Sequence, residues 1–294
     1  ISLIKEKNKQ INNVLLPNLI CEEMISVVQQ HNLNILYYSI DNELNYDIDE
    51  IKQLTVNNKN ILVFVNYFGC KILNKEVSNL KGNNFLIEDN AHVLNNDSNN
   101  QHTMIGDYSF SSLRKMLPIL SGAEVHSKND DLNFNSNIRI PNIGELIYSI
   151  RGLKKKSSKT SLMGHQKDTN NLDISCIDIF SKFILQRYKF SYQNILSMRR
   201  KNFNFWDRYL SRSNLRSMQS ITNNISLCPY AYPCYAYNNS DITEWLDWGK
   251  EKNISIISWP KYHKHTSKYI PDNHLRKILL FPVNHQFDLS KIIG

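Results

Sequence analysis

Short apolar runs alternate with amphipathic, polar segments along the first half of the chain. The runs lie at 14–16, 35–40, 61–65 and 85–87, and helical patterns separate them at 22–30 and from 47 onward. Continuous apolar runs of β-prone residues are typical of strands buried on both faces. Their alternation with helices favours a parallel sheet with right-handed crossovers. The pattern therefore predicts an α/β fold.

The second half begins with a polar stretch, residues 127–170, which is rich in Ser, Asn, Lys and Asp and predicts a long loop or linker. A helical pattern follows over 177–210, and its basic run Arg199-Arg-Lys201 is interpreted as an exposed face. Strands at 230–237, 254–258 and 278–283, and a helix over 241–252 capped by Ser240, predict a second, smaller α/β unit. We expect a large domain over 1–160, a connecting segment over 161–215 and a small domain over 216–294.

Composition narrows the classes of function. With 294 residues, 41% of them hydrophobic, the chain can bury a core, which excludes wholesale disorder. The 35 basic and 27 acidic residues leave a net charge of +8, which falls short of a dedicated nucleic-acid binder unless the excess is clustered. Five cysteines without a CxxC pair indicate neither a disulfide framework nor a zinc ribbon, and favour the reducing cytoplasm. No apolar run reaches the roughly 18 residues of a membrane span. We expect no membrane, nucleic-acid or metal partner, and interpret the Lys-rich run at 154–159 and the histidines at 263, 265 and 274 as solvated surface.

Two residues suggest chemistry. Asp89 follows the run at 85–87, at the carboxyl end of a predicted strand, where ligands bind in open α/β sheets. An aspartate there could cap a helix, hold a metal or pair with a cationic ring nitrogen. Lys115 follows a Ser-rich strand end, and serine hydroxyls suit a phosphate while a lysine amine suits a carbonyl carbon. An aspartate about 26 residues before that lysine would keep a pyridine ring protonated and make it an electron sink.

Several segments, in order along the chain, match one enzyme family. They are Leu15-Leu-Pro17, residues 38–47, Asn66-Tyr-Phe-Gly69, Ile87-Glu-Asp-Asn-Ala-His92, Gly106-Asp107 through Lys115, Trp259-Pro260 and residues 280–286. With these the chain resembles the sugar aminotransferases of the DegT/DnrJ/StrS type. Those are pyridoxal-phosphate (PLP) enzymes with the aspartate aminotransferase fold, fold type I. The resemblance implies a mainly parallel sheet of the seven-stranded type, with helices on both sides and a smaller C-terminal α/β domain.

The resemblance also implies roles for individual residues. Lys115 would bind the cofactor covalently and move the proton during catalysis, and Asp89 would pair with the ring N–H. His92 would lie near the phenolic oxygen of the cofactor. Ser111 or Ser112 would contact the phosphate, although the serine of the family usually stands where this chain has Phe110. Cys21 stands where many members place an aromatic residue against the ring; its alternative is a small buried apolar residue.

The activity implied is transfer of an amino group from glutamate to a nucleotide-linked keto-sugar, in surface polysaccharide or glycan biosynthesis, by a homodimer. Gly122-Ala123, where the family has Gly-Gly, is a mild departure, and two larger departures concern whole segments. The Gly-Thr/Ser turn that cradles phosphate would lie upstream of Ile1, so the N-terminal segment of the family is expected to be missing, and the usual Asn-Tyr-Arg segment is not recognisable in 127–170. A degenerate relative that serves as a binding or scaffold protein is therefore an alternative. A sugar dehydratase of the same fold is another, although such relatives tend to replace the lysine.

Overall fold

The computed structural model describes residues 1–56, 59–70, 75–94, 104–129, 132, 177–188, 192–218, 228–260 and 278–293. Most of the polar stretch at 127–170, including the Lys-rich run, lies outside the described residues, as do the histidines at 263, 265 and 274. Within the described residues, every helix is too short or too polar to cross a membrane.

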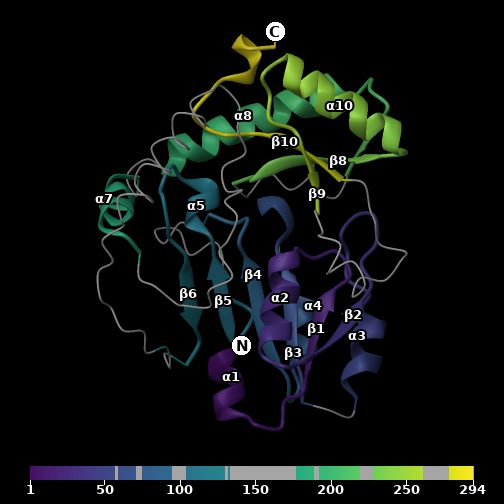
Figure 1. Ribbon diagram of the computed structural model, residues 1–294, viewed down its shortest axis with the longest axis vertical. Coiled ribbons are helices and arrows are strands. Elements are labelled where there is room, and N and C mark those ends of the chain that lie inside the picture. The colour runs from purple at the N-terminus through teal and green to yellow at the C-terminus, as the bar shows by residue number, and fades with distance from the viewer. Residues whose placement is uncertain are drawn as a thin grey trace.

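The first half of the chain forms a six-stranded sheet (Figure 1). Its strands are β1 (Asn13–Pro17), β2 (Asn34–Tyr38), β3 (Ile61–Val65), β4 (Phe85–Asn90), β5 (Tyr108–Ser111) and β6 (Glu124–Ser127). The spatial order is β2-β1-β3-β4-β5-β6; the first five are parallel, and β6 runs antiparallel to β5. The predicted parallel α/β sheet is confirmed, with six strands in the described residues where the resemblance implied a seven-stranded type.

Short helices connect these strands. They are α1 (Ser2–Lys7), α2 (Glu22–Gln30), α3 (Ile48–Thr55), α4 (Lys75–Asn79) and α5 (Leu113–Met116), with a 3-10 turn η1 (Tyr67–Gly69) after β3. The acidic start of α3 is confirmed, because the Asp47 side chain accepts a hydrogen bond from the backbone N–H of Glu50. Figure 1 shows α2 in front of the sheet and α3 beside its β2 edge.

The second half forms a four-stranded antiparallel sheet in the order β7-β8-β10-β9. Its strands are β7 (Leu215–Ser217), β8 (Ala231–Ala236), β9 (Ile257–Trp259) and β10 (Ile278–Pro282); the helices are α7 (Ile179–Tyr188), α8 (Tyr192–Leu210), α10 (Asn239–Glu251) and a 3-10 turn η4 (Leu289–Lys291). Trp206 of α8 anchors this unit, because its fully buried ring packs 4.9 Å from that of Phe281 and its N–H donates to the Pro282 carbonyl (2.8 Å).

Some predicted boundaries were wrong. The helix expected to start at Asp241 after Ser240 begins two residues earlier, since Asn238 is the N-cap and exchanges hydrogen bonds with Asp241 in a capping box. The pattern over 177–210 is divided between α7 and α8. Strand β4 does not end at Ile87 but continues through Asn90, because its backbone pairs with β3 and β5 to that point. Asp89 therefore belongs to the strand itself.

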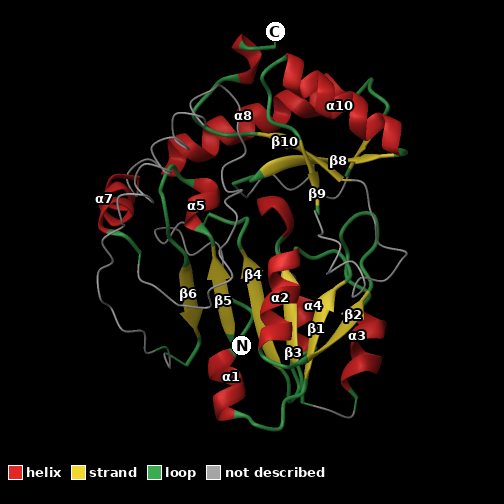
Figure 2. Cartoon of the chain, in the orientation of Figure 1, coloured by secondary structure: helices red, strands yellow, loops and turns green. Residues whose placement is uncertain are grey.

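The two sheets meet where the parallel strands end. Figure 2 shows β4 and β5 pointing toward the four-stranded sheet. The N–H of Tyr230 donates to the carbonyl of Phe68 in η1 (2.7 Å). Gly69 has a φ of +66°, and a Cβ there would lie 2.5 Å from the backbone oxygens of both His92 and Cys228. Only glycine allows the two segments to come this close.

Gly69→Ala is expected to lower the free energy of unfolding by roughly 2–4 kcal/mol, because left-handed strain adds to overlap with two backbone carbonyls. Gly82→Ala is the matched control: its φ is also positive (+43°), but nothing lies within 4 Å of the added methyl. It should cost only about 1–2 kcal/mol. Urea denaturation measures both, and equal losses would contradict the close approach.

Candidate active site

Strand β4 ends in three polar residues, Glu88, Asp89 and Asn90. Because successive side chains of a strand point to opposite faces of the sheet, Glu88 and Asp89 have different surroundings. Glu88 is buried and accepts hydrogen bonds from the backbone N–H groups of Ile105 and Gly106, so it holds the chain that enters β5. Asp89 points to the opposite face of the sheet. It is 5% exposed, and its Oδ1 accepts from the N–H of Ala91 (2.9 Å). One carboxylate is thus structural, and the other lies at the sheet edge where ligands bind.

Lys115 reaches this edge from α5. Leu113 and Met116 bury their side chains and anchor the short helix, while Lys115 between them stays partly exposed. Its Nζ lies 3.5 Å from Nε2 of His92, three residues beyond Asp89. Burial raises the pKa of Asp89, while the charge of Lys115 and the N–H of Ala91 act to lower it. The structure therefore brings Asp89, His92 and Lys115 together at this edge.

Cys21 is the N-cap residue of α2 and shares this environment. Burial, then the charges of Asp89 and Glu23, raise the pKa of its thiol to about 12, while Lys115 acts in the opposite direction. The thiol is consequently neutral at physiological pH, which excludes it as an activated nucleophile. Its position at this edge is compatible with both interpretations of Cys21, as a group that packs against a cofactor ring and as a small buried residue.

The two candidate serines differ. Ser111, the last residue of β5, is 2% exposed, and its hydroxyl has no hydrogen-bond partner in the described part of the chain. It lies opposite Asn90 in the strand register. Ser112 is the N-cap residue of α5 and is partly exposed, without a side-chain capping bond. A buried hydroxyl without a partner costs about 1–3 kcal/mol, which marks Ser111 as a group suited to a ligand.

An aromatic stack forms a wall of the site, and the sequence did not predict it. The His92 ring is nearly parallel to that of Tyr230 (4.4 Å between centroids, 3°) and to that of Phe68 (5.7 Å, 15°). Trp259 meets Phe68 edge-on at 5.2 Å. Phe68 stood inside a family-like segment and Tyr230 at the start of a predicted strand, but neither position indicated that these rings would meet. The stack fixes the plane of the His92 ring, whose Nε2 faces Nζ of Lys115.

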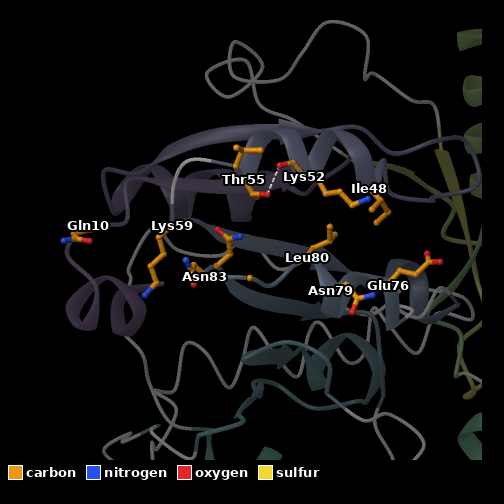
Figure 3. A pocket seen from close by; sticks show the side chains of 12 residues that line it. Gln10, Ile48, Lys52, Thr55, Lys59, Glu76, Asn79, Leu80 and Asn83 are labelled. Atoms are coloured by element: carbon orange, nitrogen blue, oxygen red, sulfur yellow. Dashed lines mark hydrogen bonds between the residues drawn. The ribbon is translucent and has the colours of Figure 1, made fainter.

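A hollow lies between helices α3 and α4, beside the parallel sheet (Figure 3). It has a volume of about 1120 Å³, and Gln10, Lys59 and Asn84, which line it, precede β1, β3 and β4. Its two lysines already have partners, since Lys52 pairs with Asp49 (3.0 Å) and Lys59 donates to Asn8 and lies over the Phe85 ring. None of the predicted site residues lines it. In the part of the chain described, no group of His, Cys, Asp and Glu could hold a metal ion.

Comparison with known proteins identifies the fold. No protein-family model matches the chain, and no curated protein matches it in sequence. Among solved structures it is similar to the putative sugar aminotransferase Spr1654 from Streptococcus pneumoniae in its PLP form (TM-score 0.69, 12% identity, 99% of this chain and 81% of that one). It is also similar to the E. coli GDP-4-keto-6-deoxy-D-mannose-3-dehydratase with bound hydrated PLP (0.66, 16%, 98% and 79%). A third is Helicobacter pylori PseC, an aminotransferase involved in the biosynthesis of pseudoaminic acid (0.63, 16%, 96% and 76%). The chain has the fold of these sugar-modifying enzymes, and the fold expected from the motifs is confirmed.

The donor set at the sheet edge fits PLP. Asp89 offers a buried carboxylate that a ring N–H would satisfy, and Lys115 offers an amine to an aldehyde. The hydroxyl of Ser111, buried without a partner, offers a hydrogen bond to an anionic oxygen. These three groups fit the ring nitrogen, the aldehyde and an anionic oxygen of the cofactor.

Asp89→Asn is expected to raise the unfolding free energy of the ligand-free protein at pH 7. Because burial raises the folded-state pKa of Asp89, the folded protein holds this proton more tightly than the unfolded chain does. This contribution to stability is therefore lost as pH rises from the unfolded value near 3.8 through the folded value. Asparagine removes that dependence and can still accept from Ala91.

Urea denaturation between pH 4 and 8 measures the difference. Asp288→Asn is the control of opposite sign, because hydrogen bonds from Lys201 and Ser290 lower the pKa of Asp288 to about 2. That variant should gain no stability at any of these pH values. A loss of stability in Asp89→Asn at pH 7 would contradict the expectation.

Proposed function

We propose that this chain is a PLP-dependent aminotransferase that transfers an amino group from glutamate to a nucleotide-linked keto-sugar, in surface polysaccharide or glycan biosynthesis. One observation carries the proposal: Asp89 and Lys115 share the carboxyl edge of the sheet with Ser111, whose buried hydroxyl lacks a partner. The fold is that of enzymes whose names include sugar aminotransferases and a keto-sugar dehydratase.

When bound, PLP supplies a protonated ring that withdraws electrons from the carbon that loses or gains the amino group. Asp89 would accept the ring N–H and keep the proton on that nitrogen. Its buried carboxylate is suited to this, because a cation beside it offsets the cost of its desolvation. Replacement by asparagine would remove the charge and leave the ring a weaker electron sink.

Lys115 would hold the cofactor and then move the proton at the reacting carbon, as a general base and acid. His92 would orient the amine, since its Nε2 faces Nζ of Lys115 and its ring cannot turn between Phe68 and Tyr230. The same aromatic wall would exclude water from the lysine. Ser111, with Ser112 as the alternative, would bind the phosphate, and the neutral Cys21 thiol would pack against the ring.

The substrate class, assembly and location belong to the same proposal. The names of the solved structures include a dehydratase of a nucleotide-linked keto-sugar, which supports that class of acceptor. The motif resemblance supports a homodimer with each active site at the subunit interface. The described cysteines Cys21, Cys70, Cys228 and Cys234 are free thiols, which supports a reducing cytoplasm.

Incubation with PLP should give a visible absorbance band that glutamate bleaches, because the Lys115 amine binds the aldehyde and glutamate then converts the cofactor to its amine form. Lys115→Ala should lack the band, whereas Lys250→Ala, which changes an exposed lysine paired with Asp247, should keep it. Borohydride reduction followed by peptide mass spectrometry should place the added mass on Lys115.

The outcomes separate the candidates. Return of the visible band on addition of a nucleotide-linked keto-sugar, with formation of an amino sugar, supports the aminotransferase. Loss of water from the keto-sugar without a new C–N bond would instead support a dehydratase. A correctly folded wild-type protein without any band would reject both and support a binding or scaffold role.

Light scattering at micromolar concentration should give about twice the 34.4 kDa of the chain, because two subunits are expected to share the active sites. The measurement is made with and without PLP, since ligands that bind across an interface favour the dimer. A monomer under both conditions would contradict the proposed assembly.

A further inference from the structure

Arg199 of α8 is buried at the junction of the two sheets, although the sequence predicted an exposed basic face. Its side chain is 2% exposed, while Arg200 is partly exposed and Lys201 is exposed and paired with Asp288 (2.6 Å). In the described part of the chain no carboxylate pairs with Arg199, and its Nε has no hydrogen-bond partner. A buried guanidinium of this kind is costly unless other polar groups solvate it.

Backbone carbonyls from two distant segments solvate this charge. Nη2 of Arg199 donates to the carbonyl of Met116 (3.0 Å), in the helix that carries Lys115. Nη1 donates to the carbonyl of Pro229 (2.9 Å) and, more weakly, to that of Tyr230 (3.4 Å). Arginine can do this because its donors are spread over a rigid, planar fork, whereas the donors of lysine share one nitrogen.

Both segments lead directly to the candidate site. Met116 follows Lys115 in α5, and the ring of Tyr230 stacks on His92. His92 in turn lies 3.5 Å from Nζ of Lys115. Arg199 therefore contacts the helix that carries Lys115 and also the backbone of Tyr230. Lys115 and Tyr230 both contact His92, so the four residues are linked in a closed series of contacts. One buried side chain therefore contacts both the segment that carries the amine and the segment whose ring supports the imidazole facing it.

We propose that Arg199 is a positioning residue for Lys115: by holding the carbonyls of Met116 and Tyr230 in one frame, it fixes the amine against His92. The importance of that amine rests on the proposed function, but the positioning itself is a property of the ligand-free protein. It can therefore be tested without PLP, and its failure is distinguishable from failure of the aminotransferase proposal.

The first test is competitive acetylation of the ligand-free protein across pH 6–10, with the rate at each lysine read by mass spectrometry. In Arg199→Met and Arg199→Lys the rate at Lys115 should change by about threefold or more, because the amine loses its fixed contact with His92. Lys128 and Lys250 are internal standards whose rates should not change. Arg200→Met is the matched control and should leave Lys115 as in the wild type.

A second variant keeps the proposal testable if substitution of Arg199 prevents folding. Tyr230→Leu removes the ring from the stack but leaves the carbonyl that Arg199 binds, and it should also change the Lys115 rate. If the two side chains act in one frame, the double variant with Arg199→Lys should show an effect smaller than the two single effects combined. An unchanged Lys115 rate in a folded Arg199→Met variant, or in Tyr230→Leu, would overturn the proposal.

With PLP and glutamate, Arg199→Lys should lower kcat by about 10- to 100-fold and change KM little, because misplacement of a catalytic group by about 1 Å affects the reaction more than binding. A loss confined to KM would contradict positioning of the amine. A change in acetylation without any PLP band in the wild type would keep the positioning role and reject the enzyme.

Discussion

The backbone contact between the η1 turn and the segment before β8 is the constraint on which the rest of the structure depends. Gly69 lets the chain after β3 pass against the carbonyl of Cys228, and the Tyr230 N–H bonds to Phe68 at the same place. This contact brings the antiparallel sheet to the carboxyl ends of the parallel strands. Without it, the rings of His92 and Tyr230 would not stack, and the imidazole that faces Lys115 would lose its support.

The buried Asp89 carboxylate and Ser111 hydroxyl lower the stability of the ligand-free fold, and the same two groups are available to bind a ligand. Burial raises the pKa of Asp89, so its ionised form weakens the fold, and Lys115 offsets only part of this. The partnerless hydroxyl of Ser111 is a second cost of the same kind. Both costs fall when a ligand brings a cation to the carboxylate and an acceptor to the hydroxyl. Functional sites commonly hold such unfavourable groups because the ligand, rather than the protein, satisfies them.

The sequence predicted what local patterns determine. The run of β3 and the helix of α2 were located to the residue, because an uninterrupted apolar run and a clear amphipathic period each define an element. The rule that ligands bind at the carboxyl ends of parallel strands placed Asp89 at this edge, whereas the roles of His92 and Lys115 beside it came from the resemblance of their segments to one enzyme family. The exposure of Arg199 was mispredicted because burial of a charge depends on distant carbonyls, here those of Met116 and Tyr230, which no local pattern reveals. The stack of Phe68, His92 and Tyr230 joins segments far apart in the chain and was missed for the same reason.

The two buried charges Arg199 and Asp89 are compensated to different extents by the protein. The difference argues against a purely structural role for the carboxyl edge of the parallel sheet. Arg199 is solvated within the protein by backbone carbonyls, so its charge needs no ligand. Asp89 has one backbone N–H and the field of Lys115, and its raised pKa shows that these do not suffice. A protein that used the fold only as a scaffold would be more stable with a neutral residue at position 89. The carboxylate is therefore best explained by a cationic partner from outside the chain, and the pyridine N–H of the proposed cofactor is such a partner.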